Sequence, residues 1–255
     1  MNLGIIGCGA IGTDVALAAD KIKEIKKIYL YDIKKKASDK LCKKTKKAEI
    51  MKVKDFLPHV DIVFEGASQE AVYEYAEQVL KAGKDLILMS VGSLFDDNFR
   101  KKIEKIAKDK NCKIHVPSGA ICGVDGILSA NIDGLDEVTL VTTKPPESFS
   151  KTFGVRSVLF KGNARDAVKK FPSNINVAAS LSLAGKGFNK TKVEIVADPV
   201  ASRISHKILA HGKFGRLRVD LENMPNPSNP SSSYMASLSA IATLKRIIEP
   251  IQIGV

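Results

Sequence analysis

A glycine-rich motif near the start of the chain most restricts what the chain can fold into. Residues 7–12 read Gly-Cys-Gly-Ala-Ile-Gly, directly after a short apolar segment and directly before an amphipathic one. Asp32 follows Gly12 by 20 residues, at the end of the next apolar segment. A strand, a glycine turn, a helix and a later acidic residue are typical of the first βαβ unit of a Rossmann-type parallel sheet.

Each glycine of this motif is needed at its position for a separate physical reason. Gly7 permits the tight turn, Gly9 lets the backbone approach a pyrophosphate, and Gly12 lets the helix pack closely on the strand. The amides at the start of the helix face the negative charge of the ligand. The residues expected to bind a dinucleotide here are Gly7, Gly9, Ala10, Ile11, Gly12 and Asp32.

The residues around Asp32 bear on which dinucleotide binds. Its carboxylate would accept hydrogen bonds from ribose hydroxyls, which favours NAD, but Lys34–Lys36 follow at once and would suit the 2′-phosphate of NADP. We therefore expect NAD or NADP. Residues 21–54 hold 14 Lys against 4 acidic residues, which is most of the net charge of +12. Since this stretch contains no Arg, we interpret it as a solvated surface that attracts an anionic cofactor, with no nucleic acid as a partner.

The pattern of apolar residues divides the chain into two parts. Up to residue 116 strands and helices alternate, as in an α/β fold with a parallel sheet. We predict strands at 3–6, 28–31, 61–65, 85–90 and 112–116, and helices at 11–20, 69–82 and 97–108. After Pro117 the chain has the pattern of an α+β domain with a mostly antiparallel sheet. Its predicted strands are 137–143, 193–197, 204–210 and 217–221, and its helices are 164–170 and 173–184, the latter opened by Pro172 and Ser173.

The end of the chain belongs with the first part. Residues 224–233 contain three prolines and four serines, which exclude a central strand or the interior of a helix. A periodic apolar segment at 234–248 predicts a C-terminal helix that packs on the first domain. We thus assign 1–117 with 230–255 to the dinucleotide-binding domain and 118–229 to a second domain.

Small residues follow three of the predicted strands, at 67–69, 90–92 and 118–120. Ligands of open α/β sheets lie beyond the carboxyl ends of the strands, where small residues leave backbone amides accessible. On this ground we expect Ala67 and Ser68 to contact the cofactor. Of the three turns, the one at 118–120 is the strongest candidate for a ligand-binding turn, because it belongs to a longer run of small residues just before the second domain.

Two histidines of the second part are candidates for proton transfer. His206 alternates onto the same face as Ile204 and Ile208, which shields the imidazole, although such a histidine is often a satisfied core residue. His211 lies beside Gly212 at a predicted hairpin turn, where we expect it to be exposed. From the pattern alone, both a catalytic and a structural role for His206 stay open.

The chain resembles the L-aspartate dehydrogenase family over essentially its full length. The resemblance rests on motifs that follow one another in the same order. They are residues 7–12, Glu65–Val72, Ser118–Ile121, Phe171–Pro172 with Asn174–Ala179, Val196–Pro199, Ile204–Ile208, Gly212–Gly215, and Asn229–Pro230 with Ser232–Tyr234.

This resemblance implies an activity and residue roles. It implies oxidation of L-aspartate to iminoaspartate, or its hydrolysis product oxaloacetate plus ammonia, with NAD or NADP, supplying quinolinate and NAD synthesis. The family's catalytic histidine falls on His206, and its further cofactor contacts fall on Ala120 and Asn176. The family also implies a homodimer. For the substrate carboxylates the sequence leaves five candidates open, namely Lys144, Lys161, Arg165, Lys186 and Lys213.

Other classes of protein fit the sequence less well. We find no apolar run long enough for a membrane span and no leader pattern, so we expect a cytoplasmic location and no membrane partner. The spacing of the four cysteines does not suit a zinc site, and we expect all four to be small buried residues and no bound metal.

Two alternative functions remain. One is a related homoserine-dehydrogenase-like or dihydrodipicolinate-reductase-like enzyme, and the other is a nucleotide-sensing regulator that binds DNA.

Overall fold

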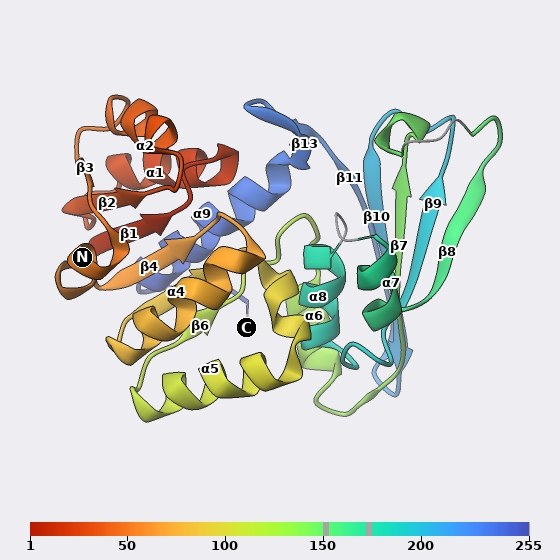
Figure 1. The fold of residues 1–255 in the computed structure, drawn as a ribbon. Helices are drawn as coiled ribbons and strands as arrows, with labels where there is room; N and C mark the ends of the chain where they lie inside the picture. The colour runs from red at the N-terminus through yellow and green to blue at the C-terminus, as the bar shows by residue number, and fades with distance from the viewer. Residues whose placement is uncertain (150–152, 172–174, 255) are drawn as a thin grey trace. The chain divides into compact units, whose positions relative to one another are not determined.

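The computed structural model describes residues 1–149, 153–171 and 175–254, which form two compact units (Figure 1). Unit 1 comprises residues 1–117 with 236–252, and unit 2 comprises residues 118–235 with 253–255. Among the described residues, no helix is long and apolar enough to cross a membrane.

Unit 1 is built on a six-stranded parallel sheet with the order β3-β2-β1-β4-β5-β6. Its strands are β1 (Asn2–Ile6), β2 (Lys27–Tyr31), β3 (Ala48–Ile50), β4 (Ile62–Glu65), β5 (Asp85–Leu88) and β6 (Ile114–His115). The central strands β1 and β4 are almost continuously apolar and buried, as expected for a parallel sheet covered on both faces. The strand order reverses between β1 and β4, and the predicted Rossmann-type architecture is confirmed.

The helices of unit 1 begin where the sequence provides caps. They are α1 (Ala10–Lys21), α2 (Lys35–Cys42), α3 (Val53–Phe56), α4 (Gln69–Lys81) and α5 (Asp97–Asp109), with 3₁₀ turns η1 (Leu57–His59) and η2 (Val91–Phe95). The Ser68 hydroxyl accepts a hydrogen bond from the Ala71 amide at the start of α4. Asp96 likewise caps α5 through the amides of Asn98 and Phe99. The sequence analysis missed α2, β3 and α3, because these elements span only three to eight residues each.

The C-terminal helix α9 (Tyr234–Ile248) has the predicted bounds and packs into the core of unit 1. Its buried residues Ala236, Ala240 and Leu244 are spaced four apart, so they form one stripe along the helix. That stripe contacts the core around the buried strands β1 and β2, including Ile5 and Leu30. The expectation that this helix belongs with the first part of the chain is confirmed.

Unit 2 contains a five-stranded sheet with the order β11-β10-β7-β9-β8. Its strands are β7 (Leu135–Lys144), β8 (Ser157–Asn163), β9 (Lys192–Ala197), β10 (Ile204–Gly212) and β11 (Gly215–Asn223). All pairs are antiparallel except β7 with β9, so the predicted mostly antiparallel sheet is confirmed. Its helices are α6 (Val124–Ala130), α7 (Ala164–Lys170) and α8 (Ile175–Ala184), with a 3₁₀ turn η3 (Pro146–Ser148). Pro172 and Ser173, predicted to open α8, lie outside the described residues.

The proline-rich segment forms a small ribbon. Among the described residues, strands β12 (Pro225–Asn226) and β13 (Asn229–Ser233) pair only with each other, which agrees with the exclusion of a central strand.

The expectation of buried cysteines was wrong for two of the four thiols, since Cys122 is exposed and Cys42 is only partly buried. Cys122 lies in the irregular segment just before α6, between Gly123 and the buried Ile121.

Candidate functional site

The glycine loop after β1 has the geometry that a pyrophosphate site requires. Gly7 has a φ of 98°, and a Cβ at Gly12 would lie 1.9 Å from the Gly7 carbonyl oxygen, so a larger residue cannot occupy position 12 without moving the turn. A Cβ at Gly9, by contrast, would meet no atom of the described residues within 4 Å. The space over Gly9 is therefore open at the N-terminus of α1, where the exposed amides begin.

Asp32 is held rigidly at the end of β2. One of its carboxylate oxygens accepts a hydrogen bond from the Cys8 amide at 2.7 Å, and the other accepts one from the Lys34 amide at 2.7 Å. The first bond ties the carboxylate to the glycine loop, and the second orients the start of the lysine run. The side chains of Lys34–Lys36 are exposed, as expected of a solvated surface.

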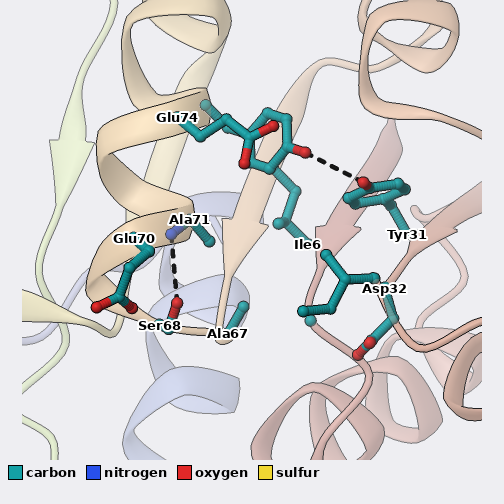
Figure 2. A pocket seen from close by; sticks show the side chains of 11 residues that line it. Ile6, Tyr31, Asp32, Ala67, Ser68, Glu70, Ala71 and Glu74 are labelled. Carbon is teal, nitrogen blue, oxygen red and sulfur yellow. Dashed lines mark hydrogen bonds between the residues drawn. The ribbon is translucent and has the colours of Figure 1, made fainter.

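A cavity of about 120 Å³ lies at the point where the strand order reverses. Figure 2 shows Tyr31 and Asp32, from the end of β2, across from Ala67 and Ser68 at the start of α4. Gly7 also lines this cavity, so the structure brings four predicted cofactor residues, Gly7, Asp32, Ala67 and Ser68, to one place. Open α/β sheets bind their ligands at this position.

The walls of the cavity include side chains that the sequence analysis missed. Glu70 and Glu74 of α4 line it, together with Tyr75, whose hydroxyl donates a hydrogen bond to the Tyr31 hydroxyl at 3.1 Å (Figure 2). The spacing of Glu70 and Glu74 places them one helical turn apart on α4. That spacing was readable from the sequence, but only the fold shows which face of α4 borders the cavity.

A buried carboxylate joins the two loops that follow β4 and β5. Glu65, at the end of β4, is 2% exposed and accepts hydrogen bonds from the Ala67 amide, the Ser90 amide and the Ser90 hydroxyl, at 2.8 to 3.0 Å. Burial raises the pKa of this carboxyl, while the hydrogen bonds oppose the rise. Glu65 thereby fixes the predicted ligand turns at 67–69 and 90–92 to each other.

His206 is buried in the sheet of unit 2, with 5% of its surface exposed. It lies directly opposite Thr142 on β7, and its Nδ1 is 3.0 Å from the Thr142 hydroxyl oxygen. Burial, and to a smaller extent the positive charge of Lys144, together lower the pKa of His206 to about 4. The imidazole is therefore neutral near pH 7 and held in one orientation. His211 on the same strand is exposed, as expected, with 52% of its side chain accessible.

The turn that contains Ala120 is anchored within unit 2. The Ala120 carbonyl accepts a hydrogen bond from the buried Asn223 side chain at 3.0 Å, and Asn223 in turn accepts one from the Ser233 hydroxyl at 2.8 Å. Asn176 lies exposed in the first turn of α8. Unit 2 thus contains His206, Ala120 and Asn176, whereas the other predicted site residues lie in unit 1. The roles of all of them stay predictions.

Two family models match the chain, one in each unit. The model described as "Homoserine dehydrogenase, NAD binding domain" matches residues 7–117, and the model described as "Aspartate dehydrogenase, C-terminal" matches residues 125–247. The first match agrees with the glycine loop and the cavity beside Asp32. The second spans the strand that carries His206.

Relatives match over the full length. The chain is 43% identical to the L-aspartate dehydrogenase of Methanosarcina barkeri, covering 100% of this chain and 99% of that protein. It is 41% identical to the one of Methanothermobacter thermautotrophicus, with 100% and 98% covered. Among solved structures, the aspartate dehydrogenase of Thermotoga maritima superposes with a TM-score of 0.84 at 32% identity, covering 100% of this chain and 99% of that one.

Proposed function

The chain belongs to the L-aspartate dehydrogenase family, and we propose that it oxidises L-aspartate to iminoaspartate with NAD or NADP as the hydride acceptor. The observation that carries the proposal is the full-length identity to L-aspartate dehydrogenases, which includes the domain around the buried His206. A Rossmann-type unit alone would leave the substrate undetermined, because many dehydrogenases share it.

The residues of unit 1 fit NAD or NADP. The open space over Gly9 and the amides at the start of α1 would hold the pyrophosphate, and Asp32 would bind the ribose beside the cavity of unit 1. When bound, the nicotinamide accepts the hydride from the substrate. We propose that unit 1 is the dinucleotide-binding domain and that unit 2 supplies the substrate-binding and catalytic residues, with Ala120 and Asn176 as further cofactor contacts.

We propose that His206 accepts a proton from the substrate ammonium, since the nitrogen lone pair must be free before a C=N bond can form. The neutral imidazole expected near pH 7 is the form that can accept this proton. In the tautomer in which Nδ1 donates to the Thr142 hydroxyl, Nε2 presents its lone pair to the substrate. The hydrogen bond to Thr142 then holds the plane of the ring.

Two further proposals follow from the family. We propose a homodimer, as the resemblance to the family implies, and a cytoplasmic location. Light scattering on the purified protein would give twice the mass of one chain if the homodimer forms, and the mass of one chain if it does not.

The activity can be tested by following the absorbance of the reduced cofactor. We expect turnover with L-aspartate in one direction and with oxaloacetate plus ammonia in the other, with NAD and NADP compared in each. Homoserine serves as the competing substrate, because the first-domain match bears that name. Turnover of homoserine without turnover of aspartate would refute the proposed function.

The role of His206 needs a variant and a matched control. His206→Ala should lower kcat at least about tenfold with NADH affinity near normal, because loss of a general base costs roughly 10²-fold or more. His211→Ala removes the exposed imidazole at the end of the same strand and should keep nearly full activity. An unchanged kcat in His206→Ala would refute the assignment.

A further inference from the structure

The sheet of unit 2 separates its charged residues by face. One face carries cations and carboxylates in pairs, including Lys161 with Glu194 at 2.7 Å and Lys207 with Asp220 at 3.2 Å. On the opposite face the residues of β7, β9 and β10 are apolar or neutral, apart from His206 and Lys144. That face is made by Val138, Leu140, Thr142 and Lys144 of β7, by Val193, Ile195 and Ala197 of β9, and by Ile204, His206, Ile208 and Ala210 of β10.

Lys144 is the last residue of β7, two residues beyond Thr142, so the two side chains point to the same face. Thr142 lies directly opposite His206, which makes Lys144 the diagonal neighbour of the imidazole across the strand pair. The charge of Lys144 acts on the pKa of His206, which agrees with this placement. Its neighbours on the other side are Ala197 of β9 and, beyond it, Ser157 of β8, neither of which carries a charge.

Within the described part of the chain, the Lys144 ammonium has no ion pair and no hydrogen bond. It is nevertheless partly buried, and burial lowers its pKa. A desolvated cation without a counter-charge is unfavourable in a folded protein, since nothing replaces the water that it lost. Such a group beside a buried histidine is characteristic of a site that binds an anion from outside.

The other candidate cations for the substrate carboxylates are already engaged. Lys161 pairs with Glu194, and Lys213 lies 3.8 Å from Asp133 with most of its side chain exposed. The Lys186 ammonium donates to the Leu135 carbonyl. Arg165 donates to the Asn189 side chain at 2.7 Å and stacks over the ring of Phe188.

We propose that the Lys144 ammonium binds a carboxylate of the dicarboxylate substrate, next to His206. The inference rests on the proposed function and names one residue that binds its substrate. Asp198, whose amide donates to the Lys144 carbonyl, pairs its carboxylate with Arg156 at 3.4 Å, so an anion from outside would supply the counter-charge of the Lys144 ammonium. Because Lys144 is the diagonal neighbour of His206, a carboxylate bound there would bring the amino group of the same substrate close to the imidazole. That imidazole is the group proposed to accept the amino proton.

The experiment compares three variants. Lys144→Met keeps an unbranched side chain of nearly the same length and removes the charge, Lys144→Arg keeps the charge, and Lys161→Met is the matched control on the opposite face. Loss of one charge-assisted hydrogen bond should raise KM for L-aspartate about tenfold to a hundredfold in Lys144→Met. The KM for NAD should stay unchanged and kcat should change little, because this contact binds the ground state and the transition state alike.

A binding measurement without cofactor gives an independent readout. Calorimetry with succinate, a dicarboxylate that cannot react, should show at least about tenfold weaker binding to Lys144→Met, partial recovery in Lys144→Arg and no change in Lys161→Met. Circular dichroism verifies that each variant is folded, and removal of an unpaired buried charge should not destabilise the chain.

The outcomes separate the two proposals. If the unaltered protein does not turn over aspartate, the proposed function fails, whatever the variants do. If the unaltered protein is active and Lys144→Met keeps its KM for aspartate and its affinity for succinate, the inference about Lys144 alone is overturned.

A comparison of L-aspartate with L-asparagine identifies which carboxylate Lys144 binds. If Lys144→Met raises KM for aspartate only, Lys144 binds the side-chain carboxylate. If it raises KM equally for both substrates, Lys144 binds the α-carboxylate.

Discussion

Burial of His206 should make the folded chain sensitive to mild acid in a way that can be calculated. An unfolded histidine has a pKa of 6.5, whereas burial and Lys144 lower the pKa of His206 to about 4 in the folded chain. Between these two values the unfolded chain binds a proton that the folded chain does not bind. Stability from this residue is therefore fully present above pH 6.5 and is lost as the pH falls towards 4.

The magnitude follows from the difference in pKa. At about pH 5 the unfolded imidazole is protonated and the folded one is still neutral, and the gap between pH 5 and 6.5 is about 1.5 units. At 1.36 kcal/mol per unit, this residue should reduce the free energy of unfolding by about 2 kcal/mol between pH 7.5 and pH 5. All other titrating groups contribute as well, so the effect has to be measured against a variant.

The measurement is denaturant unfolding, followed by circular dichroism, at the two pH values. His206→Gln keeps a polar side chain but does not titrate, so its stability should fall by about 2 kcal/mol less than that of the unaltered chain. His211→Gln, which removes an exposed imidazole, should behave like the unaltered chain. Equal losses in the unaltered chain and in His206→Gln would show that His206 is not held neutral in the folded state.

Two other predictions concern the cofactor site. Gly12→Ala places a methyl group against the Gly7 carbonyl and should cost about 1 to 3 kcal/mol of stability, whereas Gly9→Ala faces open space and should change stability by less than about 0.5 kcal/mol while it weakens NADH binding. Thermal unfolding and NADH fluorescence separate the two effects, and equal stability losses in both variants would contradict this interpretation of the loop. Replacement of Lys34–Lys36 by Ala should weaken NADPH binding about tenfold more than NADH binding, because exposed charge pairs contribute roughly 0.2 to 1 kcal/mol each. Equal weakening of both cofactors would mean that these lysines act only as a general attractive field.

Much of unit 1 could be predicted because its signals are local. The glycine motif, Asp32 and the alternation of apolar segments lie within short stretches, so spacing alone indicates the Rossmann-type sheet. The bounds of α9 were predicted exactly, since its apolar residues keep the helical period over 15 residues. The short elements α2 and β3 were missed because few residues in them are buried.

The sequence by itself determined the identity of the chemical groups: a dinucleotide loop, a shielded histidine and a set of candidate cations. Only the tertiary structure decided which of them meet. Thr142 reaches His206 across 64 residues of sequence because β7 and β10 pair in one register, and that register also aligns Lys144 with the imidazole. Likewise, Glu70 and Glu74 border a cavity only because α4 begins beside the end of β2. The pairing of distant strands depends on the packing of the whole sheet, and a shift by one residue would turn these side chains to the other face.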